Sequence, residues 1–310
     1  MKAIVGDGVR WVGCDPMDED TIQTELRDAD ICVSPRLTPS MIADGSRLKL
    51  VHATGAGVEQ ISMELAPNAL LANTYNHGRS TAEYVLLCMM AHSRELLKSD
   101  RLLRQGVWYS SLKDPSVPLA TTLRGKTLGI VGFGEIGREL CTLAQAMGLS
   151  VAAIKRSPDP ELAARMGLSW LGTMSDTARL LKESDFITIA VPLDDSTLNL
   201  VSTEQFALMR PSAFLVNVAR GGIVNEAALF DALATSTISG AAIDVWWQYP
   251  VGAEGRPSAL PFESLDNVIM TPHTSSLTAE TMDRRARDIA LNIDRFRNGQ
   301  PLENLVVGGN

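Results

Sequence analysis

Short apolar runs alternate with helix-like stretches in the first part of the chain. The runs cover residues 3–5, 31–33, 48–52 and 70–72. Short apolar strands separated by helical patterns are typical of βαβ units, which build a parallel sheet. Residues 81–103 then carry apolar side chains at helical spacing and predict one long helix. Residues 114–118 break the helical pattern that follows.

A second alternating series begins at Lys126. The expected strands are residues 128–131, 151–154, 186–191, 213–218, 241–245 and 268–270, with helical stretches between most of them, the first at 135–147. This order predicts a doubly wound α/β domain with a parallel sheet. The last helix is expected at 278–297, where Asn298 and Gly299 provide a stop signal.

Composition narrows the class of protein. The 310 residues are 45% hydrophobic and 21% charged, which fits two globular domains better than one. The net charge of −8 argues against general nucleic-acid binding, which needs a basic face. The longest apolar run in a helical context, residues 84–91, is too short to span a bilayer, and the N-terminus lacks the pattern of a signal peptide. We therefore expect neither a nucleic-acid nor a membrane partner.

The cysteines indicate the compartment. The sequence has four cysteines, Cys14, Cys32, Cys88 and Cys141. They are widely spaced and form no CxxC pair and no Cys/His cluster. This spacing is typical of reduced core residues and predicts a cytoplasmic protein without a metal site.

A glycine-rich segment follows the strand expected at residues 128–131. It reads Gly132, Phe133, Gly134, Glu135, Ile136, Gly137 and opens a helix. The strand and helix around this GxGxxG pattern make it a dinucleotide-binding signature. Gly132 permits the tight turn, Gly134 lets the pyrophosphate approach the backbone, and Gly137 lets helix and strand pack closely.

The next strand ends without the acidic residue that usually binds the ribose 2'-hydroxyl. Lys155, Arg156 and Ser157 follow it instead. A carboxylate would repel a 2'-phosphate, whereas Arg156 can pair with one. The sequence therefore predicts NADP(H) in preference to NAD(H). If this turn is only a solvated basic segment, we expect the protein to use either cofactor.

Several further segments, in this order, complete a family pattern. They are residues 54–58 (TGAGV), 82–84 (AEY), 191–197 (VPLDDST), 217–222 (NVARGG), 242–245 (AIDV) and 271–273 (TPH). With the GxGxxG segment, they make the chain resemble the D-isomer-specific 2-hydroxyacid dehydrogenase family over nearly its whole length. This family lies in one superfamily with glyoxylate and hydroxypyruvate reductases, phosphoglycerate dehydrogenase and formate dehydrogenase.

The resemblance implies the domain organisation and the assembly. Residues 1–93 and 279–310 would form a flavodoxin-like substrate domain, and residues 94–278 an inserted Rossmann cofactor domain. Both would be doubly wound α/β domains with parallel sheets. The resemblance also implies a homodimer, formed largely through the long helix after Thr81 and its neighbours.

The resemblance further implies hydride transfer between a nicotinamide and C2 of a small 2-oxo or 2-hydroxy acid. Arg220 follows a buried strand, and its guanidinium can hold the substrate carboxylate. Backbone N–H groups of Ala56, Gly57 and Val58 would bind the other carboxylate edge, where glycine permits close approach.

His273 is the expected acid and base, since an imidazole can donate and accept a proton near neutral pH. By resemblance Asp244 would bind the nicotinamide carboxamide, although it could equally cap a strand end. The matching segments add further cofactor-binding residues, namely Thr81, Val191, Pro192, Thr197, Val218 and Ala219.

The chain departs from the family where a glutamate normally orients this histidine, five residues after Asp244. Here Tyr249 stands at that position, with Gln248 beside it. A phenol can orient an imidazole, but it cannot stabilise imidazolium as a carboxylate does. Three hypotheses follow. The protein reduces 2-oxo acids with a lower pH optimum, it oxidises an aldehyde hydrate or a formate-like anion, or it is a weak enzyme that serves as a nucleotide-sensing binding protein.

Overall fold

The computed structural model describes residues 1–16, 18–42, 47–63, 68–250 and 254–307. By internal packing the chain divides into two compact units. The small unit comprises Met1–Asn76 and Leu277–Asn310, and the large unit comprises His77–Ser276. No helix among the described residues is long and apolar enough to cross a membrane.

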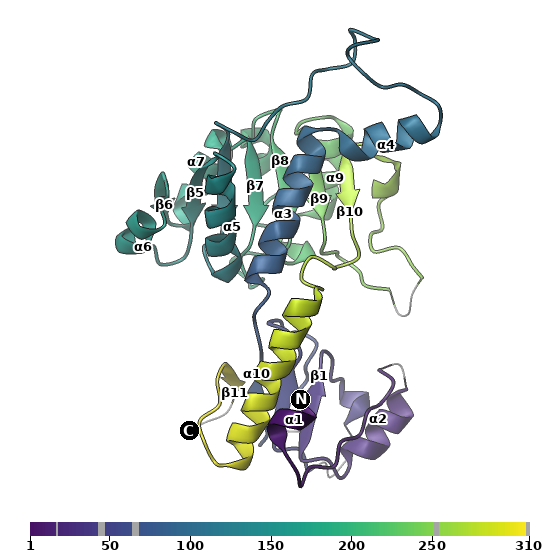
Figure 1. The fold of residues 1–310 in the computed structure, drawn as a ribbon, viewed down its shortest axis with the longest axis vertical. Coiled ribbons are helices and arrows are strands. Elements are labelled where there is room, and N and C mark those ends of the chain that lie inside the picture. The colour runs from purple at the N-terminus through teal and green to yellow at the C-terminus, as the bar shows by residue number, and fades with distance from the viewer. Residues whose placement is uncertain (17, 43–46, 64–67, 251–253, 308–310) are drawn as a thin grey trace. The chain divides into compact units, whose positions relative to one another are not determined.

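The large unit is built on a parallel sheet, seven-stranded in its described residues (Figure 1). Its strands, from one edge to the other, are β10 (Val268–Met270), β9 (Gly240–Ile243), β8 (Phe214–Asn217), β7 (Phe186–Ile189), β4 (Thr127–Val131), β5 (Ser150–Ile154) and β6 (Trp170–Gly172). The chain reverses its direction across the sheet between β4 and β7. This order confirms the predicted doubly wound α/β fold.

Helices cover both faces of this sheet. They are α3 (Gly78–Ser93), α4 (Leu96–Arg104), α5 (Glu135–Ala146), α6 (Pro160–Arg165), α7 (Thr177–Glu183), α8 (Thr203–Leu208) and α9 (Glu226–Ala234), with short 3-10 turns η2 (Met174–Asp176), η3 (Gly221–Ile223) and η4 (Phe262–Ser264). In Figure 1, α3 and α5 lie side by side on one face.

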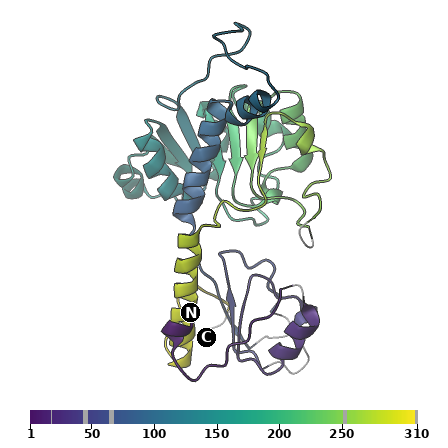
Figure 2. The ribbon, with the colours of Figure 1, turned by 45° about the vertical axis from the view of Figure 1, so that its right-hand side comes forward.

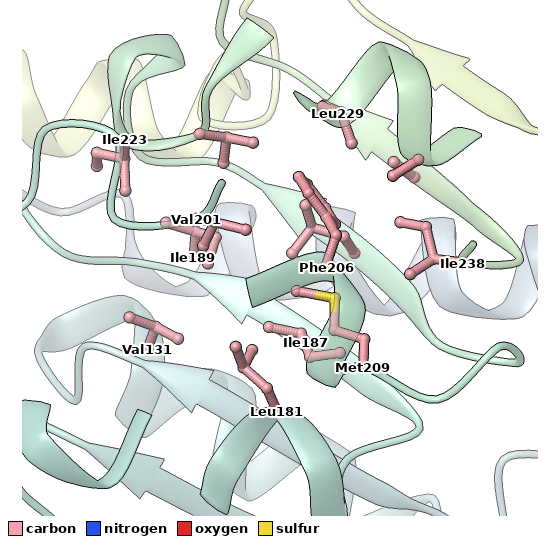
Figure 3. Close-up of a cluster of buried hydrophobic side chains, with 14 of the residues drawn as sticks. Val131, Leu181, Ile187, Ile189, Val201, Phe206, Met209, Ile223, Leu229 and Ile238 are labelled. Carbon is pink, nitrogen blue, oxygen red and sulfur yellow. The ribbon is translucent and has the colours of Figure 1, made fainter. Parts of the chain in front are cut away.

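Side chains of the buried strands alternate between the two faces, as they must in a sheet covered on both sides. Along β7 and β8, Phe186 and Phe214 pack beneath α3 and α5. Ile187 and Leu215 enter the opposite core with α7, α8 and α9. Figure 3 shows this second core, in which Phe206 and Leu229 meet the strand side chains. The apolar runs in the sequence are thus explained by two-sided burial.

The expected long helix at 81–103 is wrong as a single element. The chain instead forms α3 and α4, separated at Arg94 and Glu95. Glu95 adopts a φ of 46°, in the left-handed region, which ends the helical path although the apolar spacing continues. The bend between the two helices is visible in Figure 2.

The small unit also contains a sheet, four-stranded in its described residues. It has parallel strands β1 (Ile31–Ser34), β2 (Leu50–Ala53) and β3 (Leu70–Ala72), with β11 (Leu305–Val307) antiparallel to β3. Its helical elements are α1 (Lys2–Val5), α2 (Glu19–Leu26), η1 (Pro39–Met41) and α10 (Ala279–Arg297). Parallel α/β structure is therefore confirmed here as well.

The expected strand at residues 3–5 is wrong, because these residues belong to α1. Val5 is buried with Ile289, Ala290 and Ile293 of α10, so the apolar run is satisfied by helix packing and not by a sheet. Such a short apolar run does not by itself distinguish strand from helix.

The packing units and the expected domains differ at α3. This helix packs on α5 and therefore belongs to the large unit, whereas the expected boundary followed it at residue 93. The assignment of substrate and cofactor roles to the two domains remains a prediction.

Candidate active site

The predicted site residues of the large unit gather at one edge of its sheet. The glycine turn follows β4, whereas Arg220, Asp244 and His273 follow β8, β9 and β10, which are neighbours in the sheet. These are the carboxyl ends of parallel strands, where ligands of open α/β sheets bind, and the reversal between β4 and β7 lies at the same edge.

The glycine turn is tightly packed at two of its glycines and open at the third. Gly132 has a φ of +99°, and a Cβ there would lie 2.4 Å from the carbonyl oxygen of Ala190. A Cβ at Gly137 would lie 2.7 Å from the Gly132 oxygen, so α5 packs tightly on the turn. By contrast, a Cβ at Gly134 would meet no atom within 4 Å. Gly134 precedes the 12-residue helix α5 without a side-chain cap, leaving open space before the N–H groups of its first turn.

Glu135, the first residue of α5, is directed away from this open space. Its Cγ would lie 2.6 Å from a Cβ at Gly78, and its Oε2 lies 4.0 Å from Nδ1 of His77. The absence of a side chain at Gly78 therefore makes room for the Glu135 carboxylate. We expect the backbone N–H groups of Glu135 and Ile136, and not this carboxylate, to face a phosphate.

Arg156 forms an ion pair that the sequence did not signal. Its Nη2 donates to Oδ2 of Asp194 at 2.7 Å. The other oxygen of Asp194 accepts from N and Oγ of Ser196 at 2.9 and 2.5 Å. The hydrogen bonds from Ser196, more than the one from Arg156, lower the pKa of the Asp194 carboxyl group. The neighbouring Lys155 donates its backbone N–H to Gly172 on β6.

The segment after β7 closes on itself through Thr197. The Thr197 hydroxyl donates to the Pro192 carbonyl and accepts from the Asp194 N–H, both at 2.8 Å. The hydroxyl thereby fixes the shape of the turn. The other residues predicted to bind the cofactor, Thr81, Val191, Val218 and Ala219, are buried in the large unit.

Arg220 lies at the start of η3, in a loop held by the side chain of Asn217. The Asn217 Oδ1 accepts from the Ala219 N–H at 3.2 Å, and its Nδ2 donates to the Arg220 carbonyl at 3.0 Å. Nη1 of Arg220 donates to the Ala219 carbonyl at 2.7 Å. Gly221 packs closely behind, since a Cβ there would lie 2.4 Å from the backbone of Trp246. Asn217, quoted in the sequence only as part of a motif, is thus the residue that shapes the loop.

Tyr249 contacts His273. The phenol oxygen lies 3.0 Å from Nδ1 of His273, and the ring centroids are 5.6 Å apart. The Trp246 backbone N–H also donates to this phenol oxygen, at 3.3 Å. The side chain that lies beside this histidine nitrogen is therefore a phenol and not a carboxylate.

Asp244 is fully buried and holds the loop that carries His273. Its Oδ1 accepts from the Thr271 hydroxyl at 2.6 Å and from the Thr274 N–H at 2.8 Å. Its Oδ2 accepts from the Ser275 N–H at 2.9 Å. His273, inside this loop, has a φ of +58°, which is uncommon for a residue with a side chain. These contacts support the strand-end capping role for Asp244, and the expected contact with a carboxamide stays a prediction.

In the small unit, Ala56, Gly57 and Val58 lie in a half-buried loop after β2. Nδ2 of Asn73 donates to the Ala56 carbonyl at 2.8 Å and anchors this loop to the end of β3. Within the described part of the chain, the N–H groups of Ala56, Gly57 and Val58 donate no hydrogen bond. Also within that part, no group of three His, Cys, Asp or Glu side chains is arranged to bind a metal ion.

Comparison with known proteins establishes the family. The family model described as D-isomer specific 2-hydroxyacid dehydrogenase, NAD binding domain, matches residues 86–275. The chain is also 31% identical over 304 residues to a glyoxylate reductase of Aeropyrum pernix, covering 96% of this chain and 88% of that protein. The chain belongs to the D-isomer-specific 2-hydroxyacid dehydrogenase family.

Two further family relationships differ in extent. A D-3-phosphoglycerate dehydrogenase of Methanocaldococcus jannaschii is 32% identical over 296 residues, or 94% of this chain, but the chain spans only 54% of that protein. The structure of a D-lactate dehydrogenase from Aquifex aeolicus, complexed with NAD and lactic acid, matches with a TM-score of 0.80 at 25% identity, over 93% of this chain and 90% of that one. Membership of this dehydrogenase family supports NAD(P)-linked hydride transfer on 2-hydroxy or 2-oxo acids.

Proposed function

We propose that this family member is an oxidoreductase that reduces small 2-oxo acids with NADPH in preference to NADH. The observation that carries the proposal is the pairing of His273 with Tyr249 beside the Arg220 loop, at the ends of neighbouring parallel strands. A proton donor and a guanidinium at one sheet edge are the two groups that reduction of a 2-oxo acid requires from the protein.

Arg220 binds the substrate carboxylate in this proposal. A guanidinium offers two parallel donors to a planar carboxylate, with the adjacent C2 oxygen within its reach. The Asn217 contacts restrict the loop, so little backbone freedom remains to be lost on binding. The assignment of Ala56, Gly57 and Val58 to the second carboxylate edge stays an expectation from the sequence.

His273 supplies the proton. When Nδ1–H of the imidazole donates to the Tyr249 oxygen, Nε2 is the nitrogen that exchanges a proton with the C2 oxygen of the substrate. Trp246 fixes the Tyr249 oxygen from the other side. Tyr249 therefore orients the ring, but it supplies no negative charge to the imidazolium. A lower pH optimum than a carboxylate would give is expected.

The glycine turn and α5 fit a nicotinamide dinucleotide, because Gly134 leaves open space in front of the N–H groups at the start of α5, where a phosphate would bind. When bound, the reduced nicotinamide supplies the hydride for C2. Lys155, Arg156 and Ser157 would receive the 2'-phosphate of NADP, and Asp244, Thr81 and the residues after β7 and β8 would line the rest of the cofactor site.

The experiment that tests this function measures NADPH and NADH oxidation with glyoxylate, hydroxypyruvate and phenylpyruvate from pH 5 to 8. Turnover that prefers NADPH and rises toward low pH is the expected result. Turnover with formate or an aldehyde in place of these acids would favour the oxidation hypothesis. Tight nucleotide binding without any turnover, in the parent and in His273→Ala alike, would favour the nucleotide-sensing hypothesis.

A homodimer is also proposed. Large apolar side chains are exposed on α4 and on the loop that follows it. In Figure 1 this loop projects from the sheet and helices of the large unit. Trp108 is 68% exposed and Leu112 is 92% exposed, an arrangement that a second copy of the chain would cover. All four cysteines are free thiols, which supports action in a reducing compartment such as the cytoplasm.

A further inference from the structure

The Arg156–Asp194 ion pair lies across the predicted cofactor site. Arg156 follows β5 and Asp194 follows β7, and β4 lies between these two strands in the sheet. The glycine turn leaves the carboxyl end of β4. The pair therefore connects the two sides of the strand from which the turn emerges. The adenosine half of a dinucleotide bound at this turn must lie beside it.

We propose that Asp194 is a cofactor-specificity residue, which holds Arg156 in competition with the 2'-phosphate of NADP. The inference rests on the proposed cofactor preference and deepens it. With NAD(H), whose ribose carries only a hydroxyl, the ion pair remains. With NADP(H), Arg156 exchanges the Asp194 carboxylate for the phosphate.

The size of the effect follows from exposure. The Arg156 and Asp194 side chains are 75% and 40% exposed, so water screens both partners. Exposed ion pairs contribute little, and breaking this one lowers NADP(H) affinity by roughly twofold to fivefold. The expected result is a protein whose preference for NADPH is moderate because Asp194 opposes it.

The turn allows the charge of Asp194 to be removed without changing its shape. In Asp194→Asn, the side-chain oxygen can still accept from the Ser196 N–H, as Oδ1 does now at 2.9 Å. The backbone contact from Asp194 to Thr197 is unaffected. Asp195→Asn is a matched control, because Asp195 is the adjacent exposed acid and has no ion pair with a described residue. Both variants change the net charge equally.

The test measures dissociation constants of 2',5'-ADP, 5'-AMP, NADPH and NADH by fluorescence titration, at low and at high salt. Asp194→Asn should tighten 2',5'-ADP and NADPH by about twofold to fivefold at low salt, leaving 5'-AMP and NADH unchanged. Asp195→Asn should have a smaller effect. In an Arg156→Ala background, Asp194→Asn should no longer change the ratio of the two affinities.

Three results would overturn the role of Asp194, and a fourth would overturn the NADP preference on which that role rests. Equal effects of the two Asn variants would assign the change to net charge, and a full effect of Asp194→Asn without Arg156 would mean that the carboxylate repels the phosphate directly. If Arg156→Ala lowers the ratio of 2',5'-ADP to 5'-AMP affinity but Asp194→Asn leaves this ratio unchanged, only the role of Asp194 is wrong. If Arg156→Ala leaves the ratio of 2',5'-ADP to 5'-AMP affinity unchanged, the proposed NADP preference itself is wrong.

Discussion

Replacing Tyr249 with glutamate puts beside His273 the negative charge that the sequence resemblance led us to expect there. A carboxylate stabilises imidazolium, the form that donates the proton in reduction. The activity should therefore persist to higher pH in Tyr249→Glu, with the basic limb of the pH profile moved upward. Tyr249→Phe keeps the ring but loses the oxygen that contacts His273 and Trp246.

The magnitude can be worked from the contact. Glutamate is shorter than tyrosine, so its carboxylate would lie farther from Nδ1 of His273 than the 3.0 Å of the phenol oxygen. At a separation of roughly 5–6 Å, the attraction between the carboxylate and the imidazolium is about 0.7 kcal/mol in bulk water. At an effective dielectric constant of 20 it is about 3 kcal/mol. These limits correspond to shifts of about 0.5 to 2 pH units. Since Tyr249 is 46% exposed, we expect a shift of about 0.5–1 unit.

The assay is kcat/KM for glyoxylate with NADPH from pH 5 to 9, at two salt concentrations. Tyr249→Phe should lower kcat/KM by about twofold to tenfold, the effect of losing one hydrogen bond, without moving the basic limb of the pH profile. Tyr249→Gln is the uncharged control for the shorter side chain. A basic limb that stays at the same pH in Tyr249→Glu, or moves equally in Tyr249→Gln, would refute the reasoning.

Three further predictions concern the substrate, the assembly and acid stability. Arg220→Lys should lower kcat/KM by about 100-fold with unchanged NADPH affinity, because a point charge replaces a bidentate donor. An equal loss of kcat/KM and of NADPH affinity would indicate a folding defect. Leu112→Asp should raise the dimer dissociation constant at least about tenfold by light scattering, and an unchanged mass would place the interface elsewhere. Burial lowers the pKa of His92 to about 4 from 6.5, while its ring stacks on Phe214. Since only the unfolded chain then gains a proton below pH 6.5, the free energy of unfolding should fall by roughly 3 kcal/mol between pH 6.5 and 4. In urea titrations, the free energy of unfolding of His92→Gln, which retains a donor for Ser239, should decline less between pH 6.5 and 4. An identical decline in the parent protein and in the variant would mean that His92 is not its cause.

Strands buried on both faces could be predicted from the sequence, because successive residues of such a strand are all apolar. The two missed strands, β6 and β11, both lie at sheet edges. β6 has only half-buried residues, and β11 is exposed throughout, so neither carries the apolar signal of a central strand. The break between α3 and α4 was missed for a different reason. It depends on the backbone conformation of Glu95, a residue type that gives no turn signal.

The candidate site was predictable as a set of loops but not as a set of contacts. Glycine spacing identifies the turn after β4, because a ligand and a tight backbone both exclude side chains there. The pairing of Arg156 with Asp194 joins residues that follow different strands, and no local pattern marks it. The choice between Tyr249 and Gln248 beside His273 likewise depends on how the segment after β9 turns back.

The conformation of His273 gives the buried Asp244 a structural role in this loop. A left-handed backbone costs a residue with a side chain roughly 1–2 kcal/mol, and a free loop would relax from it. The buried Asp244 carboxylate receives three hydrogen bonds from residues on both sides of His273, and charge-assisted bonds of this kind are the stronger ones. The loop is therefore held in its unfavourable shape before any substrate binds. In the proposed mechanism, Tyr249 then has to orient only the imidazole ring, through the hydrogen bond that it shares with Nδ1.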